Sequence, residues 1–259
     1  MATALQDWRG IHESLEARWH EHAGAIGEFA LLAAVLFLVF RAIARRHRYR
    51  AVEVLSDEDR AIVEREVAEV EARTTGEIVL VVVERSDRHP AAHLWSALVL
   101  LAAGSLLLAG DLPWDRPSLV LVIQFAFAAV GFILSHLLAD YQRTFTSEAR
   151  ATEMSEEQAL QEFQRLELAR TQGRTGVLIF VSLFERRVVV LADEGINARV
   201  DDNAWLAVDD AVLADVRRGQ LREGLIAGAR VAGDLLVEHF PADGSEGGEL
   251  SNEVVVRPH

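Results

Sequence analysis

The sequence contains no cysteine and no lysine, and all 26 residues counted as Lys or Arg are arginine. Without cysteine, thiol catalysis, thiolate metal sites and disulfide bonds are excluded. Without lysine, the phosphate-loop lysine, Schiff-base chemistry and lysine general bases are excluded. The patterns GxSxG, HExxH and GxGxxG are also absent. The sequence therefore predicts no catalytic residue and no cofactor-binding residue of these kinds.

Charge and hydropathy indicate that acidic and apolar segments are separated along the chain. The formal net charge is −14, yet the mean hydropathy is positive, at +0.15. A negatively charged protein without a basic stripe repels nucleic-acid phosphates. Nucleic acid is therefore excluded as a partner, whereas a lipid bilayer is expected.

The first 44 residues are expected to form two helices. Residues 1–23 place apolar side chains at helical spacing, which predicts an amphipathic helix at a membrane surface or against a protein partner. Residues 24–44 are long enough, at about 1.5 Å per residue, to cross a hydrocarbon core of about 30 Å. This first transmembrane helix requires Glu28 and Arg41 to reach the head groups.

A transmembrane hairpin is predicted over residues 92–139, from two apolar segments at 92–110 and 118–139. The loop DLPWDRP between them is so short that the two helices must be antiparallel. Arginines cluster after the first span, before the second and after the third. The positive-inside rule then predicts a multi-pass protein of the cell inner membrane, with the N-terminus outside and the remaining domain in the cytoplasm.

The predicted cytoplasmic domain is an α/β unit in two pieces, residues 51–90 and 140–241. The apolar, mostly β-branched run at 78–83 predicts a strand that is covered on both faces. A second strand at 177–183 is expected to be its parallel neighbour, and a third is expected at 187–193. This pattern of strands and helices requires a layered sheet covered by helices.

Helices are expected from Ser56 to about residue 73, from Ser155, at 202–218 and at 221–240. Ser155 and Gln158 have the spacing of a capping box, which places a helix start there and turns Leu160 inward. The acidic tail, residues 242–259, is expected to contribute a short edge strand at EVVV.

Three stretches of the chain, in this order, resemble the TPM domain family: SDEDRAIVEREVAEVEARTTGEIVLVVVERSD, GRTGVLIFVSLFERRVVVLADEGI and LREGLIAGARVAGDLLVEHFP. The resemblance covers roughly residues 55–241. It implies a three-layer α/β/α sandwich with a small mixed sheet, here interrupted by the transmembrane hairpin. Some members are said to bind calcium and to act as weak acid phosphatases, whereas others act by contacting photosystems or receptors.

Four carboxylates are metal candidates: Asp193, Glu194, Asp201 and Asp202. They follow the third predicted strand or open the next helix, and clustered oxygen ligands suit Ca²⁺ or Mg²⁺. The alternative is that one of the later aspartates caps the helix and the others are solvated loop acids. The spacing is not that of an EF-hand, so no cofactor is assigned.

Two pairs of polar residues occupy equal depths in the predicted hairpin: His93 with His136, and Ser105 with Gln124. Polar side chains inside a membrane are costly unless they are paired. The pairs lie 12 residues apart on each helix, about 120° past whole turns, so both cannot be central to one seam.

The function predicted from these observations is that of a membrane-anchored accessory or assembly factor, which presents its domain to a membrane protein complex or another membrane-anchored partner. A non-enzymatic role is preferred. The alternative is a metal-dependent acid phosphatase that uses the 193–203 loop. A transporter component is a third possibility, which three spans with few polar residues disfavour.

Overall fold

The computed structural model describes residues 54–110, 113–171, 173–242 and 250–257. The chain divides into two compact units, residues 1–45 and 46–259. The predicted amphipathic helix at 1–23 and the predicted first span at 24–44 lie outside the described residues.

Four strands form one mixed sheet in the order β3-β2-β1-β4. They are β1 (Glu77–Val83), β2 (Gly176–Ser182), β3 (Arg187–Ala192) and β4 (Val255–Arg257). The prediction that the first two strands are parallel neighbours is confirmed, with Ile78 opposite Val177. β3 is antiparallel to β2, and β4 lies parallel to β1 at the other edge, where the tail strand was expected.

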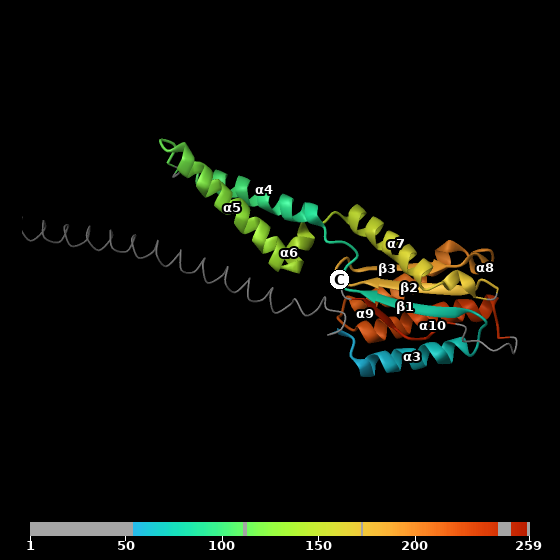
Figure 1. The fold of residues 1–259 in the computed structure, drawn as a ribbon. Coiled ribbons are helices and arrows are strands. Elements are labelled where there is room, and N and C mark those ends of the chain that lie inside the picture. The colour runs from blue at the N-terminus through green and yellow to red at the C-terminus, as the bar shows by residue number, and fades with distance from the viewer. Residues whose placement is uncertain (1–53, 111–112, 172, 243–249, 258–259) are drawn as a thin grey trace, which may run out of the picture. The chain divides into compact units, whose positions relative to one another are not determined.

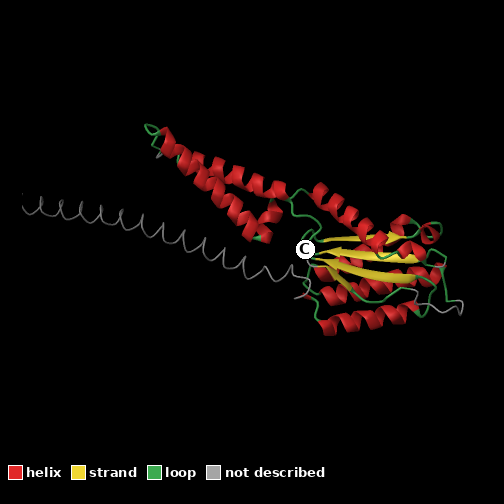
Figure 2. Cartoon of the chain, in the orientation of Figure 1, coloured by secondary structure: helices red, strands yellow, loops and turns green. Residues whose placement is uncertain are grey.

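Helices cover both faces of this sheet (Figures 1 and 2). One face packs against α3 (Asp57–Glu71), α8 (Glu194–Asn197), α9 (Leu206–Val216) and α10 (Leu221–His239), and a 3-10 turn, Asp202–Trp205, precedes α9. The other face packs against α7 (Glu148–Arg165) and the 3-10 turn Leu168–Arg170. Every residue of β1 and β2 is buried, because each strand is covered on both sides.

The ends of two helices show how local capping decides where a helix begins. Ser56 caps α3, as predicted, and it does so through a capping box with Asp59, which was not predicted. The predicted start at Ser155 is wrong, because α7 begins earlier, behind the N-cap Ser147. Within the helix, the Ser155 hydroxyl donates to the carbonyl of Ala151, so it does not cap. Leu160 is therefore on the outer side of α7 and is 51% exposed.

Between β1 and α7 the chain forms an antiparallel pair of apolar helices, α4 (Pro90–Leu107) and α5 (Pro117–Leu137), followed by the short α6 (Ala139–Thr144). Both long helices are long and apolar enough to cross a membrane. Gly131 permits their close approach, since a Cβ atom there would lie 2.6 Å from the Ser96 carbonyl oxygen. The second helix ends at Leu137, where Leu138 is extended and the chain turns into α6.

Candidate functional site

Polar residues, most of them buried, gather where the two central strands end and the helical hairpin begins. Parallel strands bring their carboxyl ends to the same edge of a sheet, which is where α/β proteins commonly place their sites. Ser182 ends β2, and the loop after β1 leads to His89, the N-cap of α4. We call the group the junction cluster; its members are Asp87, His89, Gln142, Ser182 and Glu185.

Glu185 is the centre of the junction cluster, and its side chain has no exposed surface. Its Oε1 lies 2.6 Å from His89 Nε2 and accepts the backbone N–H of Asp87 at 3.3 Å. Its Oε2 accepts the backbone N–H of Ser86 at 3.0 Å and the hydroxyl of Ser182. Since an ionised carboxylate only accepts, we place a proton on His89 Nε2.

His89 holds the start of the hairpin in an unusual backbone conformation. Its φ is 49°, in the left-handed region, although the next residue is Pro90. A non-glycine residue in that region costs on the order of 1–3 kcal/mol and persists only where the surroundings enforce it. Here the enforcing contacts are Glu185 and the ring of Phe184, which stacks on the imidazole with centroids 5.4 Å apart.

Gln142 joins the other end of the hairpin to the same loop. This α6 residue is 2% exposed, and its Nε2 donates to the carbonyl of Arg88 at 2.8 Å. Its Oε1 accepts from Arg85, whose guanidinium lies 4.5 Å from the Phe184 ring centroid. The start of the hairpin is therefore held by Glu185, and its end is joined by polar contacts to the loop that follows β1.

The arrangement of the junction cluster suits attachment better than acyl transfer. In a catalytic triad the imidazole lies between the nucleophile and the carboxylate, whereas here the carboxylate of Glu185 lies between Ser182 and His89. Ser182 is fully buried and donates its hydroxyl to Glu185, so it cannot meet a substrate. We therefore assign the cluster a positioning role.

Electrostatics agree with an ionised Glu185. Burial on its own raises the pKa of this carboxyl, but hydrogen bonds from His89, Ser182 and the Ser86 amide outweigh burial. Together they hold the pKa of Glu185 below its ordinary value. The charge is thus kept by donors that only the assembled junction supplies.

The polar residues predicted within the hairpin contact one another in the structure. Gln124 Nε2 donates to Ser105 Oγ at 3.1 Å. The rings of His93 and His136 have centroids 5.6 Å apart, and His93 Nδ1 also lies within hydrogen-bonding distance of Ser135 Oγ. Ser105, Gln124 and His93 therefore each have a hydrogen-bonding partner within the helix pair, and the His136 ring lies against that of His93.

The predicted metal residues are found at the start of short helices. Asp193 caps α8 through the amide of Glu194, and Asp201 caps the 3-10 turn through the amide of Asn203. Glu194 forms an ion pair with Arg174. Asp202 is the first residue of that turn. Within the described part of the chain, no group of three or more metal-ligating side chains comes together.

Sequence reasoning missed the junction cluster because it treated each segment separately. His89 is followed by a proline at the start of an apolar helix, and Glu185 lies three residues beyond a buried strand. Two parallel strands were predicted, so the residues following each strand could have been placed at one edge of the sheet. That step requires combining segments almost a hundred residues apart.

The fold and the junction define a mixed α/β protein with a long apolar helical hairpin inserted after its first strand. Residues 140–235 match the model of the TPM domain. The NMR structure of the BA42 protein from the psychrophilic bacterium Bizionia argentinensis is similar in fold, with a TM-score of 0.50 and 18% sequence identity. That match covers 78% of this chain and 95% of the BA42 chain. No curated protein matches the sequence.

Residues 140–235 thus match the TPM domain, as the resemblance of the second and third sequence stretches predicted, whereas the first stretch lies outside the matched residues. The likeness to BA42 shows the fold alone.

Proposed function

We propose that this protein is a membrane-anchored accessory or assembly factor whose TPM domain engages a membrane protein partner. The observation that carries the proposal is the junction cluster. Glu185, which follows β2, contacts His89 at the start of the hairpin, and Gln142, after the end of the hairpin, donates to the Arg88 carbonyl in the loop after β1. A domain attached in this way is held in one orientation at the membrane surface, which suits presentation to a neighbouring complex.

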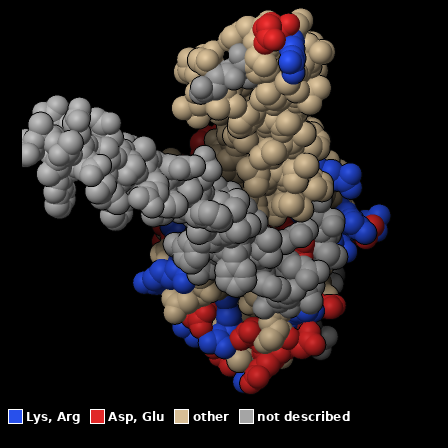
Figure 3. Space-filling model, turned by 90° about the vertical axis from the view of Figure 1, so that its left-hand side faces the viewer, with Lys and Arg blue, Asp and Glu red and all other residues tan. Residues whose placement is uncertain are grey.

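The membrane part of the proposal is supported by where the apolar side chains lie. All but two of the large hydrophobic side chains exposed in the described residues fall between Leu94 and Leu137. On the face drawn in Figure 3, the hairpin is uncharged along its length and carries charged groups at its tip, where Asp115 and Arg116 occupy the loop. In water this surface would be a severe aggregation hazard, whereas in lipid it is the expected surface.

The arginine distribution supports an orientation with the N-terminus outside and the α/β domain in the cytoplasm. Arg85 and Arg88 precede the hairpin and Arg143 follows it, whereas its loop holds a single arginine. Under the positive-inside rule the loop then faces outward.

The test of the accessory role is the fate of membrane complexes in cells that lack the protein. Native electrophoresis of mild-detergent extracts should show loss of a defined complex, and re-expression of the wild-type chain should restore it. The variant Glu185→Ala should restore it poorly, because the hairpin and domain are no longer fixed to one another. Glu157→Ala, which changes an exposed glutamate of α7, is the matched control. Unchanged membrane complexes would contradict the accessory role.

One observation favours the alternative, a metal-dependent phosphatase. Asp193 is 7% exposed, and no hydrogen bond among the described residues satisfies its Oδ2 atom. A buried carboxylate oxygen without a donor could bind Ca²⁺ or Mg²⁺ together with a phosphate.

The accessory role predicts that millimolar Ca²⁺ or Mg²⁺ leaves the melting temperature unchanged. It also predicts that Asp193→Asn hydrolyses p-nitrophenyl phosphate no more slowly than the wild type. A metal-induced shift and a hydrolysis rate that are both lost in Asp193→Asn would favour the phosphatase.

A further inference from the structure

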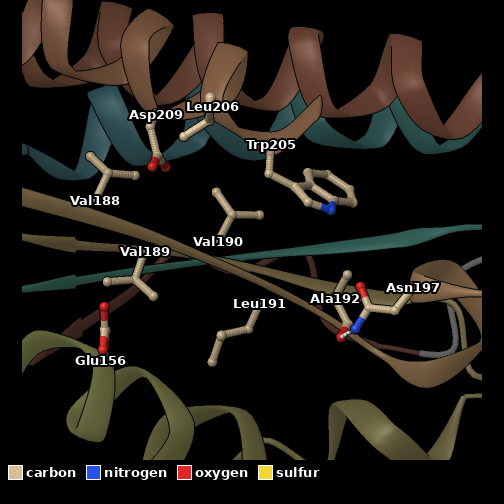
Figure 4. A pocket seen from close by; sticks show the side chains of 10 residues that line it. All are labelled: Glu156, Val188, Val189, Val190, Leu191, Ala192, Asn197, Trp205, Leu206 and Asp209. Carbon is tan, nitrogen blue, oxygen red and sulfur yellow. Dashed lines mark hydrogen bonds between the residues drawn. The ribbon is translucent and has the colours of Figure 1, made fainter. Parts of the chain in front are cut away.

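The outer edge of β3 lies open along a groove. β3 is the first strand in the sheet order and, among the described strands, pairs with β2 alone. The groove has a volume of about 330 Å³ and is lined by strand residues 188–192, Glu156 of α7, Asn197 of α8, and Trp205, Leu206 and Asp209. We call it the β3 groove. Figure 4 shows Glu156 on one side of the strand and Trp205, Leu206 and Asp209 on the other.

The backbone of β3 offers hydrogen-bonding groups to the β3 groove. The N–H of Asp193 donates to the carbonyl of Gly176 in β2 at 2.9 Å. Alternation along an antiparallel pair then turns the N–H and C=O groups of Val188, Val190 and Ala192 away from β2. Asn197 already covers the Ala192 carbonyl, through a hydrogen bond of 2.8 Å from Nδ2. The N–H and C=O groups of Val188 and Val190 remain available for a further strand.

Two side-chain atoms that line the β3 groove also lack partners. Trp205 Nε1 and Asp209 Oδ1 are buried, and no hydrogen bond between described residues uses either atom. Burial and the neighbouring Asp210 raise the pKa of Asp209 to about 6. A buried donor and a buried carboxylate that lack partners are both costly, so an occupant that supplied an acceptor and a cationic donor would relieve both.

The charges on the walls of the β3 groove select the chemistry of that occupant. The side chains of Val188 and Val190 pack toward α9, whereas those of Val189 and Leu191 pack toward α7. An added strand alternates in the same way, so adjacent side chains would face Asp209 on one wall and Glu156 on the other. Adjacent basic residues in an extended segment complement both walls. A second copy of β3 would instead bring acidic walls together.

We infer that the β3 groove is a strand-addition site for an extended segment of a partner protein that carries two adjacent basic side chains. Main-chain hydrogen bonds to Val188 and Val190 would provide affinity, and the acidic walls would provide selectivity. The inference rests on the proposed function, because it names the surface and the peptide chemistry through which the domain engages its partner.

The probe is a peptide with the sequence Thr-Val-Arg-Arg-Val-Thr. It carries fluorescein at its N-terminus and is amidated at its C-terminus. Fluorescence anisotropy is measured with the full chain in an uncharged detergent. Two comparison peptides replace Arg-Arg by Glu-Glu, or carry N-methyl groups on the amides that would face β3. We expect the Arg-Arg peptide to bind at least tenfold more tightly than either. Hydrogen exchange of the segment 187–192 should slow when that peptide binds.

Three variants locate the binding. Asp209→Asn should weaken binding at least fivefold, and Asp210→Asn, which removes the same charge from the exposed neighbouring position on α9, should not. Val190→Pro removes an outward-facing N–H, which an edge strand tolerates, and keeps an apolar side chain toward α9. It should weaken binding about tenfold while leaving the melting temperature within a few degrees.

Three outcomes would overturn the inference: equal binding of the N-methylated peptide, equal binding of the Glu-Glu peptide, or self-association of the wild type that Val190→Pro abolishes. If the membrane complex still depends on the protein while the peptides fail to bind, the strand-addition site is wrong and the accessory role stands.

Discussion

The hairpin and the α/β domain use the same apolar residue types in opposite places. In the domain, Phe180, Leu225 and Leu236 are fully buried between the sheet and its helices. In the hairpin, Phe125, Leu106 and Val122 are more than half exposed, and the residues that face the partner helix are small or polar, such as Ser96, Gly131 and Ser135. The domain therefore buries its large apolar side chains, whereas the hairpin exposes them and buries small or polar ones.

The difference agrees with the proposal that the domain lies in water and the hairpin in lipid. In water, burial of apolar area drives packing at roughly 25 cal/mol per Å². In lipid that driving force is absent between helices, and close approach of small residues and interhelical hydrogen bonds replace it. The hydroxyl of Ser96 donates to the carbonyl of Gly131 at 2.7 Å, a contact of this second kind.

The difference in packing between the hairpin and the domain is tested most directly by truncating one phenylalanine in each region. Phe180→Ala should lower the free energy of unfolding by about 3–5 kcal/mol, because it removes a fully buried ring and leaves a cavity. Phe125→Ala should change it by less than about 0.5 kcal/mol, since that ring is 69% exposed. Urea titration of the full chain in mild detergent measures both. Similar losses for the two variants would mean that the hairpin is packed like a soluble core.

A second pair of variants introduces a charge at equally exposed leucines. Leu98, at the middle of α4, is 54% exposed, and Leu160 of α7 is 51% exposed. If α4 crosses the bilayer, Leu98→Arg should cost about 3 kcal/mol of insertion free energy, as arginine does at the centre of a span. Leu160→Arg should be nearly neutral because that side chain faces water. Carbonate extraction of membranes reports the retained fraction, and equal retention of both variants would place α4 in water.

Sequence patterns predicted the strands and apolar helices well, because these depend on local periodicity. The β-branched run at 78–83 predicted a strand covered on both faces, and the run predicted at 177–183 as its parallel partner has the same character. The start of α7 was harder, because Ser147 and Ser155 are both competent caps and only packing of the whole helix distinguishes them. Leu160 was assigned to the wrong side for the same reason.

The junction could not be predicted from local patterns, because its contacts join distant segments. His89 and Glu185 are 96 residues apart, and Gln142 belongs to a third segment. Which backbone groups of β3 face outward also depends on the register with β2, which periodicity leaves open. What could be predicted was the region, an edge of the sheet where two parallel strands end.

The smallest expected effect is at the junction, where the two regions meet, and it depends on pH. Glu185→Gln keeps the shape of the side chain but removes its charge, so the hydrogen bonds from His89, Ser182 and Ser86 lose strength. At pH 7 we expect a loss of about 2 kcal/mol in the free energy of unfolding, within the range for a buried group whose partner is removed. The control is Glu157→Gln, on the exposed surface of α7, which should change little at any pH.

The sign of the pH effect follows from the lowered pKa of Glu185 in the folded chain. A carboxyl with a depressed folded pKa contributes its stability above the ordinary value of 4.5 and loses it as the pH falls through the folded value. The wild type should therefore lose stability in acid more steeply than Glu185→Gln, and the difference between them should shrink below about pH 4.5. Urea titrations at a series of pH values measure this difference. If it stayed constant down to pH 3, the hydrogen bonds at the junction would not depend on an ionised carboxylate, and the hairpin would be attached to the sheet by packing alone.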